Sequence, residues 1–420
     1  MIAPDDKAFL TGLFDAAVAA ADPGKVLARN LPGKPRGRTV VVGAGKGAAQ
    51  MAAAIETLWD APLEGVVVTR YGFAVPTRNV RVLTASHPVP DEAGVVAGKA
   101  LFEAVAGLTE EDLVVALICG GGSALLPAPP DGLTLLDDQA LNRALLNSGA
   151  PISAMNAVRK HVSTIKGGRL ALAAHPARVV SLIVSDVPGD DPAQVASGPT
   201  VPDRTGLDAA RGLVDAHQIN LPDRIRDYLD SATDAPSPDD ERFARNSISI
   251  IASARISLEA AAARAEQHGI RAFILSDAVE GEARDVGRVH AAIARETRLR
   301  DRPFATPAVI LSGGETTVTV EVGGGRGGRN TEFLLAFAGG VEGLDVTALA
   351  ADTDGIDGTE NCAGAFVDGR TWERLRKARM DPGSLLARHD SWTGLDALGD
   401  LFTPGPTGTN VNDFRAILVR

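Results

Sequence analysis

Short runs rich in β-branched residues alternate along this chain with longer amphipathic runs rich in alanine and leucine. Strands that alternate with helices are typical of βαβ units, in which a mainly parallel sheet carries helices on both faces. The run from Val114 to Ile118 is apolar on both faces, which suits a buried central strand. The alternation therefore predicts an α/β fold with mainly parallel sheets.

The positions of the predicted elements indicate how the chain is divided. Predicted strands cover residues 39–42, 65–69, 112–119, 179–185, 247–251, 272–276, 308–312, 316–322, 346–351 and 416–419. Predicted helices cover residues 44–58, 93–106, 153–174, 254–268 and 283–299. A chain of 420 residues is long for one hydrophobic core, so we expect two Rossmann-like domains. The stretch 231–241 is crowded with Asp, Pro, Ser and Ala, and it places the boundary between residues 1–240 and 241–420.

Charge and cysteine content argue against several classes of protein. With a formal net charge of −11 and no block of Lys and Arg, the chain lacks the basic footprint of nucleic-acid-binding proteins. Two cysteines far apart give no disulfide framework, which fits a reducing cytoplasm. The uncharged stretch 113–130 has a glycine-rich centre and a proline-rich end, so it predicts a strand and a loop, not a membrane span. We expect a soluble cytoplasmic protein that binds neither nucleic acid nor membranes.

A run of glycines at residues 323–328 stands between an apolar strand signal and a helical one. No side chains cover the backbone N–H groups of Gly323, Gly324 and Gly325, and such a loop at a helix N-terminus attracts anions, above all phosphate. Arg326 and Arg329 add planar cations that suit phosphate or carboxylate oxygens. The run therefore predicts an anion site.

Further glycine clusters follow three predicted strands, at residues 43–47, 120–123 and 313–315. In an open α/β sheet, ligands gather outside the carboxyl ends of the strands. We therefore expect loops from both halves of the chain to build a binding site.

The segment from Gly43 to Ala48 has two interpretations. Gly43, Gly45 and Ala48 satisfy the dinucleotide pattern G-x-G-x-x-G/A, and Arg70, at the end of the next predicted strand, could meet an NADP phosphate. Lys46 instead favours a phosphate or carboxylate, because a lysine among glycines at the mouth of a helix acts as a point charge.

Two groups of carboxylates come directly after apolar strands. Asp186 and Asp190 stand in a turn where a general base or a metal ligand belongs, although Asp is also an ordinary turn former. Asp352, Asp354 and Asp357 lie within six residues, and such oxygen ligands suit Mg²⁺ or Ca²⁺. Without a cation, or the arginines of the glycine run, this crowding would be unfavourable.

The predicted helix 153–174 carries a polar stripe. Asn156 and Lys160 are four residues apart, and Ser163 or Thr164 continues the same face. A stripe of this kind is either a solvated face or a binding surface.

Taken together, these motifs resemble one family, the class II glycerate 2-kinases, which carry a C-terminal MOFRL domain. The resemblance covers nearly the whole chain through VVGAGKGAA, ICGGGSALL, NAVRKHVSTIKGGRLA, SDVPGDDPAQVASGPT, SGGETTV, GGGRGGRNTEF, DTDGIDGT and TGTNVNDF. Thr331 stands where the family usually has Gln, whereas Arg329, Asn330 and Glu332 match.

The resemblance implies two α/β domains with the active site in an interdomain cleft. It also implies transfer of the γ-phosphoryl group of ATP to the 2-hydroxyl of D-glycerate, with Mg²⁺, to give 2-phosphoglycerate and ADP. Because negative charge spreads over the equatorial oxygens in the transition state, the protein mainly positions and neutralises the reacting groups.

The same resemblance suggests roles for the candidate residues. Lys46 and Arg329 would flank the transferring phosphoryl group and the glycerate carboxylate, and Asp190 or Asp186 would orient or deprotonate the attacking hydroxyl. The other candidates would bind substrate (Ser123, Asn156, Lys160 and Arg326), nucleotide (Gly313, Gly314, Glu315, Gly323, Gly324 and Gly325) and Mg²⁺ (Asp352, Asp354 and Asp357).

Two other functions compete with the kinase. An NADP-dependent hydroxypyruvate reductase would need neither ATP nor a divalent metal, and members of the family have often carried that label. A sensor of phosphate sugars or hydroxy acids would bind its ligand without turnover. Lys46 and the carboxylate cluster favour the kinase, and a homodimer is compatible with the chain.

Overall fold

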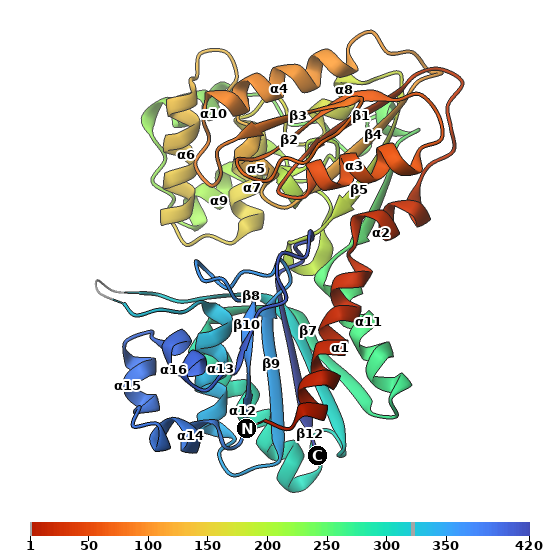
Figure 1. The fold of residues 1–420 in the computed structure, drawn as a ribbon. Coiled ribbons are helices and arrows are strands. Elements are labelled where there is room, and N and C mark those ends of the chain that lie inside the picture. The colour runs from red at the N-terminus through yellow and green to blue at the C-terminus, as the bar shows by residue number, and fades with distance from the viewer. Residues whose placement is uncertain (1, 321–323) are drawn as a thin grey trace. The chain divides into compact units, whose positions relative to one another are not determined.

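The computed structural model describes residues 2–320 and 324–420, which form two compact units (Figure 1). The N-terminal unit is Pro23–Ile251, and the C-terminal unit is Ala252–Arg420 together with the chain up to Asp22. Each unit is an open sheet with helices on its faces, so the α/β class is confirmed.

The division between the two units differs in two ways from the boundary expected after residue 240. The first difference concerns β6 (Ser247–Ala252). This strand lies beside β5 (Arg178–Val184) in the sheet of the N-terminal unit. The side chain of Asn246 supports the junction, since its Oδ1 accepts a hydrogen bond from Val179 N at 2.9 Å.

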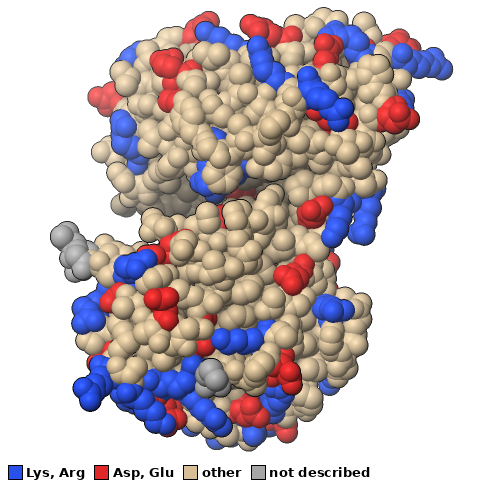
Figure 2. All heavy atoms as spheres, viewed as in Figure 1, with Lys and Arg blue, Asp and Glu red and all other residues tan. Residues whose placement is uncertain are grey.

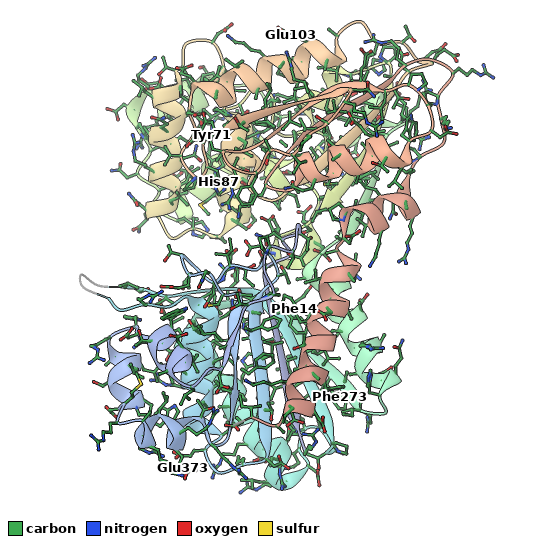
Figure 3. The ribbon with its side chains drawn as sticks, in the orientation of Figure 1. Phe14, Tyr71, His87, Glu103, Phe273 and Glu373 are labelled. Carbon is green, nitrogen blue, oxygen red and sulfur yellow. The ribbon has the colours of Figure 1, made fainter. Side chains whose placement is uncertain are left out.

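The second difference concerns α1 (Pro4–Ala20), which belongs to the C-terminal unit. Its buried face packs into one core with α11 (Ala254–Gln267) and the sheet. Phe14, labelled in Figure 3, meets the rings of Phe402 and Phe414 edge-on, with centroids 5.0 and 5.8 Å away. Burial of this face therefore attaches the start of the chain to its far end.

The sheet of the N-terminal unit has the order β3-β2-β1-β4-β5-β6, and every pair with a defined register is parallel. β4 is buried along its whole length, as its apolar sequence predicts. The strands, apart from β5 and β6 above, are β1 (Thr39–Ala44), β2 (Glu64–Arg70), β3 (Val80–Ala85) and β4 (Leu113–Cys119). The helices are α2 (Pro23–Asn30), α3 (Ala48–Leu58), α4 (Glu92–Val105), α5 (Gly122–Leu125), α6 (Leu135–Asn147), α7 (Ile152–His161), α8 (Arg169–Ala173), α9 (Leu207–Ala216) and α10 (Asp223–Ser231), with short 3-10 helices at Pro188–Asp190, Val195–Ser197 and Glu241–Phe243.

The predicted helix 153–174 is divided into α7 and α8, and two glycines stand directly before α8. Gly167 and Gly168 have φ values of 62° and 84°, in the left-handed region that favours glycine. A Cβ atom at Gly168 would lie 3.0 Å from the Phe243 ring, so the chain also passes too close to its neighbours for a larger residue.

The sheet of the C-terminal unit has the order β11-β10-β9-β12-β8-β7. β7 and β8 pair in parallel, whereas the other defined pairs among the described strands are antiparallel. This unit therefore has a mixed sheet. β12 enters between β8 and β9 in the opposite direction and sets Asp413 opposite both Gly314 and Asp352.

The elements of the C-terminal unit surround this sheet. Its strands are β7 (Arg271–Glu282), β8 (Ala308–Thr317), β9 (Val346–Asp352), β10 (Gly364–Asp368), β11 (Leu401–Phe402) and β12 (Asp413–Val419). Besides α1 and α11, its helices are α12 (Ala283–Arg300), α13 (Arg329–Gly340), α14 (Thr371–Lys377), α15 (Pro382–Ala387) and α16 (Ser391–Ala397).

β8 continues through Gly313 and Gly314, where the sequence predicted a loop. Gly314 has a φ of 115°, and a Cβ atom there would lie 2.2 Å from Val279 N of β7. Gly313 pairs with Phe414 of β12. The two glycines therefore allow close strand packing and do not form the predicted nucleotide-binding loop. The predicted strand 316–322 begins inside β8, and residues 321 and 322 lie outside the described part of the chain.

Three global features bear on the expected environment. No helix within the described residues is long and apolar enough for a bilayer span. Cys119 and Cys362 are buried free thiols, which confirms that they form no disulfide. On the face drawn in Figure 2, both units carry side chains of both signs.

Candidate active site

In the N-terminal unit, the loops after β1, β4 and β5 meet at one edge of the sheet. Lys46 N donates a hydrogen bond to Gly120 O at 2.8 Å, which joins the first two loops. A Cβ atom at Gly120 would lie 1.8 Å from Asp186 Oδ2, so the Asp186 carboxylate of the third loop packs directly against the backbone of Gly120. Because parallel strands end at the same edge, the structure brings Lys46, Gly120 and Asp186 together.

A chain of polar side chains also involves the loop after β4. The hydroxyl groups of Ser123 and Ser197 lie 2.7 Å apart, and Ser197 Oγ donates to Asn156 Oδ1 at 2.9 Å. Asn156 Nδ2 in turn donates to the Gln194 carbonyl at 3.1 Å. Ala196 and Ser197 have φ values of 54° and 59°, a conformation that costs about 1–3 kcal/mol per residue and gathers at functional sites.

The other two candidate residues of this unit are Asp190 and Lys160. Asp190 lies in the loop that leaves β5, with a left-handed φ of 56°. Lys160 is almost fully buried, and its ammonium group forms an ion pair with Asp203. The structure therefore gives Lys160 a structural partner in place of the expected substrate contact.

His87 and Arg70 stand at the same edge and were not predicted as kinase residues. Burial, together with the charges of Lys46 and Arg70, lowers the pKa of His87, labelled in Figure 3, to about 4. The Arg70 guanidinium lies 3.6 Å from the centroid of the Phe73 ring. His87 was missed because it follows β3, a strand that the sequence analysis did not predict.

We expect the imidazole of His87 to stay neutral at pH 7 and to titrate with a midpoint near pH 4. Removing the Lys46 charge in a Lys46→Ala variant should raise this midpoint, because one cation that disfavours protonation is lost. NMR titration of the histidine side chains, with a His87→Gln variant to assign the signal, measures both values. A wild-type midpoint near the ordinary value of 6.5 would contradict the observed surroundings.

The glycines of the dinucleotide pattern have a packing explanation. A Cβ atom at Gly43 would lie 2.5 Å from Leu117 O, and one at Gly45 would lie 2.3 Å from Cys119 O. Both carbonyl groups belong to β4. These two positions require glycine whatever the loop binds, so the pattern is weak support for NADP.

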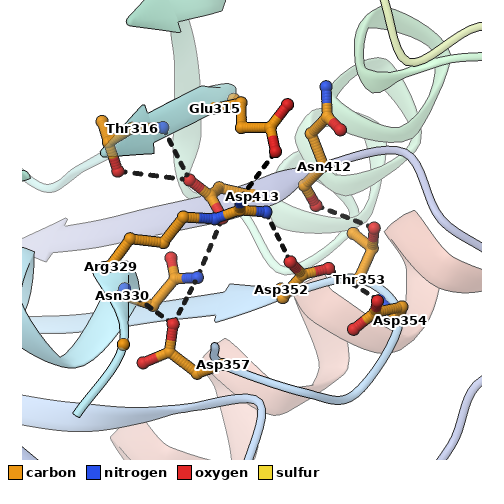
Figure 4. Close-up of polar contacts among 12 residues, drawn as sticks. Glu315, Thr316, Arg329, Asn330, Asp352, Thr353, Asp354, Asp357, Asn412 and Asp413 are labelled. Atoms are coloured by element: carbon orange, nitrogen blue, oxygen red, sulfur yellow. Dashed lines mark hydrogen bonds and ion pairs between the residues drawn. The ribbon is translucent and has the colours of Figure 1, made fainter. Parts of the chain in front are cut away.

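In the C-terminal unit, Arg329 is held by three carboxylates from the ends of neighbouring strands (Figure 4). Its Nε donates to Asp413 at 2.7 Å, its Nη1 to Glu315 at 2.7 Å and its Nη2 to Asp352 at 2.6 Å. Burial acts to lower the pKa of Arg329, but the three negative charges raise it above its ordinary value. Burial and the neighbouring Asp354 raise the pKa of Asp352 well above its ordinary value.

The amino end of α13 already holds an anion, the carboxylate of Asp357. Asn330 N donates to its Oδ1 at 2.9 Å and Thr331 N donates to its Oδ2 at 3.0 Å. The hydroxyl group of Thr331 donates to the same Oδ2 at 2.9 Å, so the residue in place of the family's Gln supports this cap. The chain's own carboxylate thus takes the place predicted for a phosphate at this helix N-terminus.

Burial raises the pKa of Asp357 to about 6, above its ordinary value of 3.8. A carboxyl group with a raised folded-state pKa favours folding below about pH 4 and loses that contribution as the pH rises through about 6. Relative to an Asp357→Asn variant, the wild-type free energy of unfolding should fall by about 2 kcal/mol between pH 4 and pH 7. Urea unfolding of both proteins at the two pH values measures this change, and a pH-independent difference would refute it.

The three predicted metal ligands do not form a ready-made cage. Among the described residues, no group of three or more His, Cys, Asp and Glu side chains is arranged to hold a metal ion. Asp352 Oδ2 faces Arg329, and its Oδ1 accepts a hydrogen bond from Asp354 N at 3.0 Å. With Asp357 occupied as a helix cap, these carboxylates do not fit Mg²⁺ as a three-ligand site.

The glycine run is less open than expected. Gly325 N donates to the Arg388 carbonyl at 2.7 Å, so this amide is already used. Gly324 packs against Val320, and Gly323 lies outside the described residues.

Arg326 also has partners within the protein. Its Nη2 donates to Glu360 Oε2 at 2.6 Å, and its guanidinium lies 3.5 Å from the centroid of the Trp392 ring. The structure therefore engages this predicted substrate-binding side chain in a surface ion pair.

A cavity of about 400 Å³ opens beside Arg329, and we call it the Thr316 cavity. Its volume lies within the range of small-molecule sites, which is about 300–1,000 Å³. The walls come from the end of β8, the glycine run, the first turn of α13 and the segment before α16. They comprise Thr316, Thr317, Val318, Val320, Gly325, Gly327, Gly328, Arg329, Glu332, Gly358, Thr359, His389 and Ser391.

Both units have relatives among known proteins. Residues 9–230 match a family described as a domain of unknown function, DUF4147, and residues 308–413 match the MOFRL family. A protein of Agrobacterium vitis that is provisionally named a hydroxypyruvate reductase is 54% identical over 98% of this chain and 94% of its own length. The D-glycerate 2-kinase of Thermotoga maritima is 38% identical over 94% of each chain. The crystal structure of the Thermotoga maritima glycerate kinase matches 99% of this chain and 100% of its own, with a TM-score of 0.89 and 36% identity.

Proposed function

The chain belongs to the glycerate kinase family, and we propose that it transfers the γ-phosphoryl group of ATP to the 2-hydroxyl group of D-glycerate. The products would be 2-phosphoglycerate and ADP. The observation that carries this proposal is the match to a D-glycerate 2-kinase over 94% of both chains.

The N-terminal unit supplies the groups that would handle the acceptor. Lys46 neutralises negative charge on the glycerate carboxylate or the transferring phosphoryl group. Asp186 or Asp190 takes the proton of the 2-hydroxyl as its oxygen attacks the γ-phosphorus. Ser123 and Asn156 orient the acceptor through the hydrogen-bonded chain that links them by way of Ser197.

The C-terminal unit supplies the groups that would handle the nucleotide. Arg329 lines the Thr316 cavity and uses three of its five N–H groups on carboxylates, so two are left for phosphate oxygens. Glu315 and Gly324 stay candidates near the phosphates. Because the described residues offer no ready cage, Mg²⁺ would arrive on ATP, where it neutralises charge on the phosphate oxygens.

The alternative activity is an NADP-dependent hydroxypyruvate reductase. The name of the Agrobacterium vitis relative favours it, as does the pattern of Gly43, Gly45 and Ala48. The packing of β4 against two of these glycines weakens the second argument. A cytoplasmic location, which two free thiols support, and a homodimer stay predictions.

Two assays on one preparation distinguish the kinase from the reductase. We expect ADP release that depends on D-glycerate, and no oxidation of NADPH with hydroxypyruvate. Oxidation of NADPH without ADP release would overturn the kinase and establish the reductase.

A further inference from the structure

The proposed function does not use Glu332, a buried carboxylate on the wall of the Thr316 cavity. Glu332 belongs to the first turn of α13, and its side chain is 2% exposed. One oxygen, Oε1, accepts a hydrogen bond from Arg284 Nη2 at 2.6 Å and lies 3.2 Å from His389 Nδ1. The other oxygen, Oε2, is buried and has no hydrogen-bond partner among the described residues.

Buried polar oxygens in proteins nearly always have a partner, so an unpaired carboxylate oxygen at a cavity requires an explanation. The side chain is not free to turn toward another partner. Arg284 is itself held, because its Nη2 also donates to the Leu386 carbonyl at 2.9 Å. His389 has a φ of 54°, a strained conformation for a residue with a side chain, and strain of this kind is found where a ligand is bound.

The other cavity residues indicate the chemistry of the missing partner. The hydroxyl-bearing residues Thr317, Thr359 and Ser391 and the cation Arg329 line the same space. Arg329 and Glu332 are three residues apart on one helix, so a phosphate-binding cation and an unpaired acceptor are neighbours. A nucleotide presents the matching pair, because its ribose hydroxyl groups lie next to its phosphates.

We propose that the Thr316 cavity binds the nucleoside end of ATP and that Glu332 Oε2 accepts a hydrogen bond from a ribose hydroxyl group. This inference rests on the proposed kinase function. In this proposal, Glu332 makes the protein bind a ribonucleotide more tightly than a deoxyribonucleotide. The raised pKa of Glu332, caused by burial and opposed by Arg284, is in keeping with a carboxylate that lacks one donor.

Binding of ADP, 2′-deoxy-ADP and 3′-deoxy-ADP, measured by calorimetry without glycerate, tests the inference. In the wild type, one deoxynucleotide should bind at least about tenfold more weakly than ADP, since a hydrogen bond to a charged group is lost. The Glu332→Gln variant should bind ADP about as weakly as the wild type binds that deoxynucleotide. In this variant, the deoxynucleotide should bind only slightly more weakly than ADP. Glu360→Gln is the matched control, since its carboxylate pairs with Arg326 at the surface and should keep the wild-type preference.

Each other outcome has one meaning. Equal binding of all three nucleotides to the wild type would overturn the role of Glu332 while leaving the kinase intact. The same preference in Glu332→Gln as in the wild type would also overturn it. No binding of ADP to the wild type, with no ADP release in the kinase assay, would overturn the proposed function itself.

If Glu332→Gln does not fold, Thr317→Phe serves instead, because a ring at this exposed position should fill the cavity and abolish ADP binding. Undiminished ADP binding to Thr317→Phe would refute the location.

Discussion

A Lys46→Ala variant should fold normally and lose about 10²- to 10³-fold in kcat for glycerate phosphorylation, the usual cost of one charge-stabilising group. Lys46 stands where the loops after β1, β4 and β5 meet, beside Asp186 and His87. Its backbone makes the local contacts, donating to Gly120 O and accepting from the Thr69 hydroxyl at 3.1 Å. Alanine keeps both contacts, so the loss should fall on turnover and not on folding.

Steady-state kinetics and thermal unfolding of the same preparation measure this effect. Lys99→Ala is the matched control, because Lys99 is an exposed lysine of α4 in the same unit. The control should keep wild-type kcat. A folded Lys46→Ala protein with near-wild-type kcat would show that Lys46 takes no part in the reaction.

An Arg329→Ala variant should lower the free energy of unfolding by about 3–5 kcal/mol, the range for removing one partner of a buried ion pair. The guanidinium is the shared partner of three carboxylates, and the side chains of Asp352 and Asp413 are 7% and 0% exposed. Without it, negative charges from three strand ends remain together with less compensation. Arg329→Lys should recover part of the loss, since one ammonium group restores the charge but not the three-pronged geometry.

Urea unfolding compares these variants with Arg326→Ala. Arg326 is a control from the same glycine run, but its side chain is 56% exposed and pairs with Glu360, so its removal should cost less than about 1 kcal/mol. Equal stability of Arg329→Ala and Arg326→Ala would mean that the carboxylates do not depend on Arg329.

Local sequence patterns are enough to predict the α/β class and the first site. Apart from β3, the strands of the parallel sheet can be predicted from their apolar, β-branched residues, and parallel strands place their carboxyl ends at one edge. Lys46 and Asp186 each follow a predicted apolar strand, so both were expected at a binding site. His87 was not, because β3 is only partly buried and its sequence gives a weaker signal.

In the C-terminal unit, local sequence patterns are not enough to predict which residues meet. Nothing within residues 413–419 states that β12 enters the sheet antiparallel between β8 and β9, yet that choice brings Asp413 to Arg329. The sequence predicted an anion at the start of α13 and separately a cluster of carboxylates, but not that Asp357 would be the anion. Such pairings join residues far apart in the chain, and tertiary packing alone decides them.

The most direct test of the kinase is the identity of its product. Purified protein with D-glycerate, ATP and Mg²⁺ should form one equivalent of ADP for each 2-phosphoglycerate, identified by phosphorus NMR, and Lys46→Ala should form almost none. ADP release accompanied by 3-phosphoglycerate would contradict the proposed acceptor hydroxyl, and absence of any phosphorylated glycerate would contradict the kinase itself.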